Sequence, residues 1–287
     1  IDGNAFGVAG LLVASVAFAA GLALLHRLVA GDLDPLTANR TVLLVAFAPV
    51  ASFFLAPYTE ALFLALSVGA ILAARRRRFL LASLLAVAAT LSRPQGILVA
   101  IPVAVELVIA TRQALQQRRP LPWSGLTLLL APASLLGFFA YTKAVSGLTP
   151  LQAEQLQMVH FALPWQGLFA TLAAWHTHPV ALINAAILLV SLALLGLMLL
   201  GRPRLPLSYV AYTAASVLVI ACRESDYANR ANPLIASDRF ALVIFPLFVV
   251  VAWLTRDRRR TFAVVLTLSA ALMLARFLIY VTNVFAA

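Results

Sequence analysis

Apolar residues follow one another in long runs along the whole chain, and short polar stretches separate the runs. Many runs approach the roughly 20 residues that a helix needs to cross a bilayer core of about 30 Å. The pattern lacks the short alternating segments of a transmembrane β-barrel, and therefore predicts an all-α membrane protein with about ten transmembrane helices. The predicted spans are Ala5–Val29, Thr41–Ala56, Tyr58–Ala74, Phe79–Leu91, Gln95–Thr111, Trp123–Lys143, Pro179–Leu200, Pro206–Cys222, Ser237–Leu254 and Thr261–Val284.

Basic residues gather at alternate connections between these spans. One set of connections holds 15 of the 21 lysines and arginines. The positive-inside rule makes this set cytoplasmic, which places both termini and the remaining connections outside. Six of the ten acidic residues then lie outside: Asp2, Glu60, Glu154, Glu224, Asp226 and Asp238. The inner basic residues are Arg27, Arg40, Arg75–Arg78, Arg112, Arg118, Arg119, Arg202, Arg204, Arg256 and Arg258–Arg260.

The composition agrees with a bilayer environment. Hydrophobic residues make up 63% of the chain, charged residues 11%, and the mean hydropathy is +0.99. A soluble domain is about one quarter charged. The net charge is +11, but most arginines end an apolar run. We therefore attribute the charge to membrane topology and expect no nucleic-acid partner. The single cysteine, Cys222, excludes a disulfide within the chain.

Residues 1–287 are expected to form a single polytopic domain, integral to a membrane that we expect to be a bacterial plasma membrane. The chain opens with Ile1 on the outer side without a basic segment ahead of its first span, so we expect a further N-terminal piece. The one long connection, Ala144–His178, is predicted to form a structured cap on the outer face.

Two predicted spans are too short to cross a bilayer. Phe79–Leu91 gives only about 20 Å of helix, so the turn Ser92–Gly96 would lie below the outer surface. Irregular backbone at that depth is tolerated only beside protein or a water-filled cavity. Thr41–Ala56 is also short and leads through Pro57 to Glu60. We therefore expect Glu60 and Arg93 to face one recessed outer cavity.

Three segments carry a resemblance to a known family. The run Ala56–Phe63 (APYTEALF), followed by Leu91–Gly96 (LSRPQG), resembles the PIG-V-type mannosyltransferases, whose pattern reads S-A-P-Y-T-E-S-L-F and then L-T-R-P-x-G. The late run Ser237–Phe248, with Arg239 and Phe245-Pro246, is similar to that family's S-x-x-R-x-x-x-x-x-F-P-x-F segment.

The resemblance implies a GT-C glycosyltransferase fold and activity. Such enzymes take mannose from a polyprenyl-phosphate or dolichyl-phosphate donor and add it to a glycan or glycolipid acceptor on the non-cytoplasmic side. The family's catalytic aspartate belongs to a W-D loop that precedes the span matched by Ala5–Val29, and no such loop stands in this sequence. Asp2 lies where that loop would end, without a preceding tryptophan. Residues 1–287 alone are therefore expected to be inactive.

The residue chemistry suits such a reaction. An inverting transfer from a sugar phosphate needs a carboxylate for the acceptor proton and cations for the leaving phosphate. Arginine suits phosphate because its planar fork stays charged and donates two bonds. We predict Glu60 as an assisting catalytic carboxylate, and the expected substrate-binding residues are Tyr58, Arg93, Gln95, Asp238 and Arg239. No cofactor is expected, although a divalent metal is not excluded.

A purely structural role is an alternative for each candidate residue. Glu60 could be an N-terminal helix residue, Arg93 a satisfied turn residue and Arg239 a snorkelling anchor. An ion-paired outer loop is the favoured interpretation of Arg223, Glu224, Asp226, Arg230 and Asp238. Arg75–Arg78 is interpreted as a topology signal, and Glu106 and Arg276 as residues paired inside the bundle. His176 and His178 are interpreted as loop histidines, and Glu154, His160, Trp165 and Trp175 as interfacial or acceptor-groove residues.

A different class of protein competes with the transferase. Ten spans around a cavity would also serve a transporter or lipid flippase, whose duplicated halves often carry broken helices in matching positions. The sequence predicts short spans only in the first half, which disfavours a transporter. A non-catalytic scaffold would leave Glu60 and Arg93 unexplained.

Overall fold

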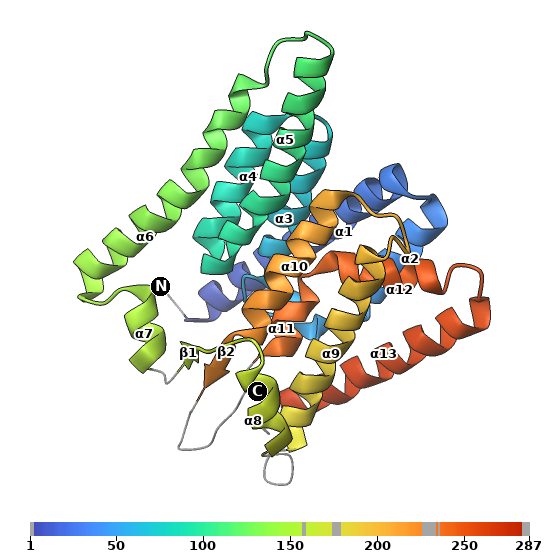
Figure 1. Ribbon diagram of the computed structural model, residues 1–287. Helices are drawn as coiled ribbons and strands as arrows, with labels where there is room; N and C mark the ends of the chain where they lie inside the picture. Colours follow the sequence, from blue (N-terminus) through green and yellow to red (C-terminus); the bar gives the residue numbers. More distant parts are fainter. Residues whose placement is uncertain (1–2, 157–158, 174–178, 226–233, 235, 283–287) are drawn as a thin grey trace.

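The computed structural model describes residues 3–156, 159–173, 179–225, 234 and 236–282 (Figure 1). Helices make up nearly all of the described secondary structure, so the all-α prediction is confirmed. Three short segments are 3-10 helices, labelled η. The elements are α1 (Gly3–Asp32), α2 (Pro35–Ala46), η1 (Ala51–Phe54), α3 (Glu60–Arg75), α4 (Phe79–Ser92), η2 (Pro94–Val99), α5 (Ala100–Gln116), η3 (Trp123–Leu129), α6 (Leu130–Ser146), α7 (Pro150–Leu156), β1 (Val159–Phe161), α8 (Gln166–Ala173), α9 (Pro179–Leu199), α10 (Leu207–Ala221), β2 (Arg223–Ser225), α11 (Ser237–Leu242), α12 (Phe245–Leu254) and α13 (Arg259–Val281).

Helix α3 lies at the centre of the bundle. Of its 16 residues 12 are buried, and it packs against α1, α4 and α5. Small residues allow these helices to approach closely, as is common between membrane helices. A side chain at Gly21 of α1 would come within 3.4 Å of the Ala65 backbone, and one at Gly69 of α3 would lie 3.3 Å from the Leu85 side chain of α4.

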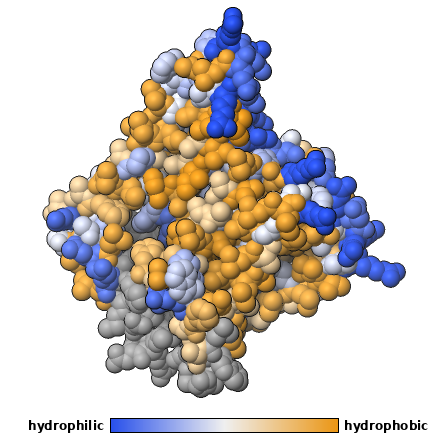
Figure 2. Space-filling view, in the orientation of Figure 1, coloured by the Kyte–Doolittle hydropathy of each residue, from blue (hydrophilic) through white to orange (hydrophobic). Residues whose placement is uncertain are grey.

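Helices α6 and α13 lie at the margins of the molecule and expose long apolar surfaces (Figures 1 and 2). None of the most apolar window of Arg259–Ile279 is buried, and only 11% of that of Trp123–Ser146 is. Monomeric soluble proteins rarely expose continuous apolar patches of this kind. Within the described residues, five helices are long and apolar enough to cross a membrane: Gly7–Asp32, Pro94–Gln116, Trp123–Ser146, Leu182–Leu199 and Arg259–Ile279.

The second predicted span has the wrong start. Helix α2 begins at Pro35 rather than Thr41, because Asp34 caps it by accepting a hydrogen bond from the Thr37 backbone N–H at 2.8 Å. Arg40 is therefore not in a connection. It is buried within α2, donates to the Thr255 carbonyl and lies 4.5 Å from the centre of the Phe262 ring.

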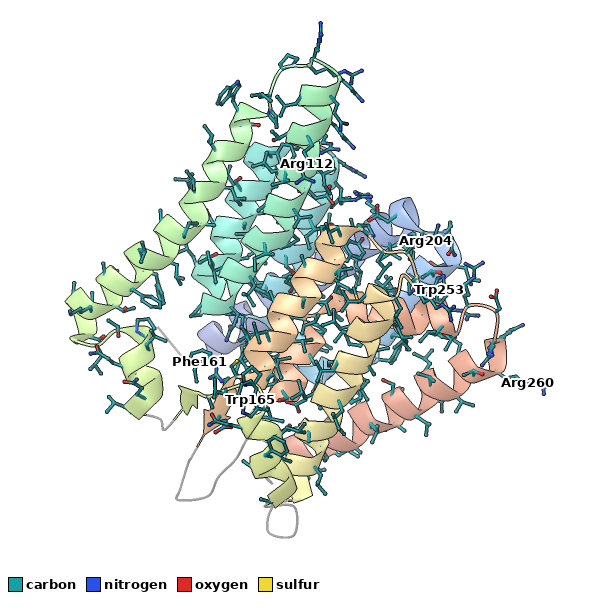
Figure 3. All side chains as sticks on the ribbon, in the orientation of Figure 1. Arg112, Phe161, Trp165, Arg204, Trp253 and Arg260 are labelled. Carbon is teal, nitrogen blue, oxygen red and sulfur yellow. The ribbon has the colours of Figure 1, made fainter. Side chains whose placement is uncertain are left out.

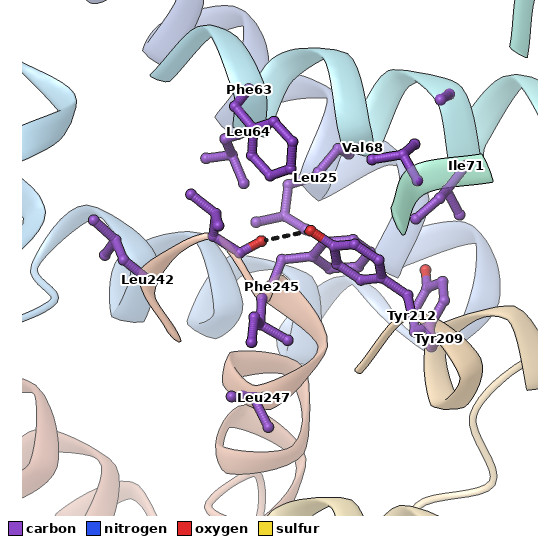
Figure 4. Close-up of a cluster of buried hydrophobic side chains, with 14 of the residues drawn as sticks. Leu25, Phe63, Leu64, Val68, Ile71, Tyr209, Tyr212, Leu242, Phe245 and Leu247 are labelled. Carbon is purple, nitrogen blue, oxygen red and sulfur yellow. Dashed lines mark hydrogen bonds between the residues drawn. The ribbon is translucent and has the colours of Figure 1, made fainter. Parts of the chain in front are cut away.

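A helix break in the second half contradicts the expectation that only the first half has interrupted spans. The predicted span Ser237–Leu254 is divided into α11 and α12, because Pro246 at the start of α12 has no N–H to donate to the preceding turn. Tyr212 of α10 donates a hydrogen bond to the Val243 carbonyl at 3.2 Å (Figure 4). The break is therefore satisfied by a side chain inside the apolar core, as backbone within a membrane requires.

A two-stranded antiparallel ribbon was not foreseen. Strand β1 belongs to the long connection Ala144–His178, and it pairs with β2, which directly follows α10. Phe161 lies opposite Arg223, and the Ala162 N–H donates to the Cys222 carbonyl at 2.7 Å. The predicted cap thus contains α7, β1 and α8 among its described residues, and its strand is tied to the end of α10.

The two sets of connections lie on opposite sides of the molecule. Arg112, Arg204 and Arg260 lie along the side that holds the α5–η3, α9–α10 and α12–α13 turns, whereas Phe161 and Trp165 lie at the other side (Figure 3). Helix α1 begins and α13 ends near the ribbon (Figure 1). The predicted grouping of the connections is therefore observed in space.

A buried polar network joins four helices at the basic side, which shows that Arg75 is more than a topology signal. Arg75 pairs with Asp32 at 2.5 Å and with Glu106 at 3.4 Å. The Tyr209 hydroxyl donates to Asp32, and the Ser208 hydroxyl donates to Glu106, both at 2.8 Å. Because both carboxylate side chains are at most 8% exposed, their pairing fixes the ends of α1 and α3 and the start of α10 against the middle of α5.

Replacing Arg75 by alanine is expected to lower the free energy of unfolding by about 3 kcal/mol or more, because it leaves two buried carboxylates without their shared cation. Arg76→Ala, in the same turn but without a carboxylate partner among the described residues, is the control and should change stability by less than about 0.5 kcal/mol. Thermal unfolding in detergent, followed by tryptophan fluorescence, measures both. Equal stability of the two variants would show that the network is not a structural constraint.

Candidate functional site

The carboxylate of Glu60 lies at the start of α3 between two arginines from distant segments. Its side chain is 1% exposed. One oxygen, Oε1, accepts hydrogen bonds from Arg239 Nε at 3.1 Å and Nη2 at 2.5 Å, and lies 3.3 Å from Arg93 Nη1. The other oxygen, Oε2, is buried and has no hydrogen-bond partner within the part of the chain that the structure describes. A buried carboxylate is tolerated here because two cations share it, and because helix N-termini favour negative charge.

Arg93 is positioned by the end of α4. Its backbone is extended, its N–H donates to the Ala89 carbonyl at 3.1 Å, and its carbonyl accepts from the Gly96 N–H at 2.8 Å. These bonds turn the chain away from the helix and direct the side chain toward Glu60. The guanidinium carbon also lies 5.9 Å from the Phe63 ring centre and 5.7 Å from that of Phe240.

The turn S-R-P-Q-G requires glycine at its last position, Gly96. A Cβ at position 96 would lie 2.1 Å from the Ala89 carbonyl oxygen and 2.3 Å from the Thr90 nitrogen, both of them backbone atoms. Only glycine allows the turn to fold back onto the last turn of α4. The position of Arg93 therefore depends on the absence of a side chain three residues later.

Arg239 of α11 is held by aromatic rings as well as by Glu60. Its guanidinium carbon lies 4.5 Å from the Phe53 ring centre and 4.7 Å from that of Tyr58. Cation–π contacts of this kind contribute about 0.5–2 kcal/mol each, depending on solvation. Tyr58 thus contacts Arg239, another of the expected substrate-binding residues. The two rings restrict the direction of the Arg239 guanidinium group.

Arg93 and Arg239 line one open recess of about 290 Å³. Gln95, one of the expected substrate-binding residues, also lines the recess, and Phe240 forms part of its apolar wall. Glu60 lies behind the arginines and is not one of the lining residues. Among the described residues that line the recess there is no carboxylate. The full lining is Ser92, Arg93, Pro94, Gln95, Arg223, Ala236, Arg239 and Phe240.

Asp238, predicted to bind substrate, is directed elsewhere. Its carboxylate pairs with Arg276 of α13 at 2.7 Å and accepts the Arg239 N–H at 2.8 Å. It does not line the recess. The ion pair connects α11 to the otherwise exposed α13, and it also supplies the partner that Arg276 was expected to have within the bundle.

Arg223, which the sequence analysis interprets as part of an ion-paired outer loop, also lines the recess. Its guanidinium carbon lies 5.0 Å from the centre of the Phe240 ring. No local motif in the sequence indicates this position, since it depends on the pairing of β2 with a strand more than 60 residues earlier. Asp226 and Arg230 of the same predicted cluster lie outside the described residues.

Several other candidates lie outside the residues that the structure describes: Asp2, Trp175, His176 and His178, together with the side chains of Glu154 and His160. In the described part of the chain, no group of three histidine, cysteine, aspartate or glutamate residues is placed to hold a metal ion.

The arrangement can bind an anion. Three guanidinium groups line a recess, and aromatic rings restrict their movement, so a phosphate group would meet donors that are already oriented.

Comparisons with models of known families, with characterised proteins and with solved structures found no match for this chain.

Replacing Gly96 by alanine is expected to destabilise the protein by about 3 kcal/mol or more, because the new methyl group would displace backbone at the end of α4. Gly137→Ala in α6 is the matched control: no atom lies within 4 Å of its Cβ position, and the change should stabilise the helix by up to about 1 kcal/mol. Thermal unfolding of both variants in detergent tests this. A Gly96→Ala variant as stable as the unmodified protein would contradict the tight turn.

Proposed function

We propose that this chain is a membrane glycosyltransferase that transfers mannose from a polyprenyl-phosphate or dolichyl-phosphate donor to a glycan or glycolipid acceptor. The observation that carries the proposal is the meeting of Arg93 and Arg239 at one recess, where both contact Glu60 although Glu60 and Arg239 are 179 residues apart. All three belong to the segments that resemble the PIG-V-type mannosyltransferases.

The recess suits the phosphate of a lipid-linked sugar. As the bond between the sugar carbon and the phosphate oxygen breaks, negative charge develops on the phosphate, and fixed cations stabilise it without reorganisation. Arg93 and Arg239 are the proposed phosphate ligands, and Gln95 is the proposed polar contact beside them. Tyr58 acts through Arg239, whose guanidinium group it faces.

Glu60 assists as a positioning residue in this proposal. Its Oε1 atom is occupied by both arginines, and it lies behind the recess rather than on its surface. The carboxylate that accepts the acceptor's proton is therefore assigned elsewhere. The family resemblance assigns it to an aspartate in a loop that precedes the segment matched by α1.

The finer topology belongs to the same proposal. Each of the ten predicted spans contains at least one helix, although several are short or broken. We place the basic connections in the cytoplasm and the ribbon, the recess and both ends of the chain on the outer face of a bacterial plasma membrane. The donor's lipid would then lie in the bilayer with its headgroup at the recess.

Replacing Glu60 by glutamine is expected to lower kcat and kcat/KM together, by roughly ten- to a hundredfold, because misplaced arginines lose contacts that matter most in the transition state. The measurement is transfer of radiolabelled mannose from polyprenyl-phosphate-mannose to membrane glycolipids by the full gene product in vesicles. Asp257→Asn removes an exposed carboxylate between α12 and α13 and should leave the rate unchanged. Full activity of Glu60→Gln would exclude Glu60 from the mechanism.

A transporter or lipid flippase is the second candidate, and the break between α11 and α12 favours it. Interrupted helices now occur in both halves of the chain, as in many transporters. The two functions are separated by the products formed in sealed vesicles. Movement of polyprenyl-phosphate-mannose across the bilayer without any new glycosidic bond would support the flippase and contradict the transferase.

A further inference from the structure

The basic side of the molecule holds many more arginines than carboxylates. Every connection on this side belongs to the part of the chain that the structure describes: 33–34, 76–78, 117–122, 200–206 and 255–258. Its carboxylates are already engaged. Arg75 pairs with both Asp32 and Glu106. Asp34 caps α2, and Asp257 lies 3.5 Å from Arg256. Among the described residues, the other arginines of this side therefore have no carboxylate within ion-pair distance.

Two helix ends on this side are built alike. Helices α3 and α5 each end in a Schellman motif, in which two successive backbone N–H groups bond back to carbonyls of the last helical turn. The donors are Arg77 and Arg78 after α3, and Arg118 and Arg119 after α5. Arg77 and Arg118 have positive φ angles of 61° and 51°, a conformation that glycine adopts with less strain. An arginine is therefore favoured at either position only if its side chain contributes an interaction.

The contribution of Arg77 is a firm attachment of the α3–α4 turn to α5. Its Nη1 donates to the Glu106 carbonyl at 3.2 Å, and its Nη2 donates to Gln113 Oε1 at 2.6 Å. Arg78 directly follows Arg77, and Arg112 directly precedes Gln113. Each partner of this hydrogen bond thus has a further arginine next to it, and both of these arginines are exposed.

The surface beside these arginines is apolar. Leu80 and Leu84 of α4, Leu115 of α5 and Trp123 of η3 are all exposed. Figure 2 shows the hydrophilic edge of this end of the molecule directly above its apolar surface. Basic and tryptophan side chains at such an edge mark the level of the lipid headgroups. A free phosphate ion would meet only the arginines, whereas a phospholipid would also cover the leucines.

We propose that the α3–α4 turn and the end of α5 form a binding site for the phosphate headgroup of an anionic phospholipid, with Arg78 and Arg112 as its main ligands. Basic clusters at a membrane surface attract anionic lipids, and guanidinium groups donate paired hydrogen bonds to phosphate oxygens. The lipid would offset the repulsion among the arginines that the two turns bring together. The site lies on the opposite side of the molecule from the recess, so it is independent of the proposed enzyme activity.

The test compares an anionic and a zwitterionic lipid with the same chains. Dioleoyl-phosphatidylglycerol and dioleoyl-phosphatidylcholine are titrated into the purified full chain in a neutral detergent, and bound lipid is measured by native mass spectrometry. The unmodified protein is expected to bind phosphatidylglycerol about tenfold more tightly, because each arginine near the surface adds to the attraction of an anionic headgroup. The double variant Arg78→Gln/Arg112→Gln should lose most of this preference.

Two further variants separate a site from general attraction. Arg259→Gln/Arg260→Gln removes two exposed charges of the same side at the start of α13, where Arg260 lies away from Arg112 (Figure 3), and should keep the preference. Arg78→Lys/Arg112→Lys keeps the charge but loses the paired hydrogen bonds, and should keep part of the preference.

Thermal unfolding gives a second measurement. Phosphatidylglycerol should raise the Tm of the unmodified protein and leave that of Arg78→Gln/Arg112→Gln unchanged, because only the former binds the lipid. Without lipid the double variant should be at least as stable as the unmodified protein, since it has fewer like charges. A double variant that is less stable without lipid would show that these arginines serve the fold and contradict the lipid site.

The binding results decide the rest. Equal binding of both lipids by the unmodified protein would overturn the proposal. An equal loss of preference in Arg259→Gln/Arg260→Gln would show attraction by the whole basic side and contradict a site at the α3–α4 turn. Inorganic phosphate that displaces phosphatidylglycerol at equal concentration would identify a free anion as the ligand. Binding of neither lipid would overturn the lipid site and favour an acidic protein as the partner of these arginines.

Discussion

The sharing of one buried carboxylate by two arginines is the interaction around which the site is organised. A charge removed from water is costly unless it is paired, and Glu60 is paired on one oxygen with Arg93 and Arg239. Helices α3, α4 and α11 must therefore keep their polar ends together. The aromatic rings that face both guanidinium groups limit the positions that the arginines can take, and both arginines line the recess whereas Glu60 does not.

Helix positions were predictable where polar residues or a proline mark both ends of an apolar run. Helix α4 occupies Phe79–Ser92, close to its predicted range, because the basic turn before it and Pro94 after it mark both ends. The start of α2 differs from the predicted Thr41. Hydropathy begins the span after the polar residues that precede Thr41, whereas the cap Asp34 and the first-turn Pro35 begin the helix before them. The break before α12 was missed because Pro246 lies within an uninterrupted apolar run, where hydropathy alone gives no sign of it.

Site residues were predictable where a charge occurs at an unusual place. Glu60 and Arg93 stand out because each follows a short apolar segment, and the structure brings them together with Arg239. Arg223 could not be found in this way, since its place depends on a strand pair between distant segments. The sequence does not distinguish Asp238 from Arg239, its neighbour on α11, whereas in the structure Arg239 lines the recess and Asp238 pairs with Arg276 of α13.

The order of the charged residues along the chain has a consequence for membrane insertion. Glu60 and Arg93 stand at the same end of the α3–α4 hairpin, so this hairpin can enter the bilayer with its two internal charges already neutralised by each other. Arg223 and Arg239 follow only after α5 to α10 have been made. The first half thus carries an electrically balanced pair, and the recess gains its other two arginines only when the second half is assembled against it.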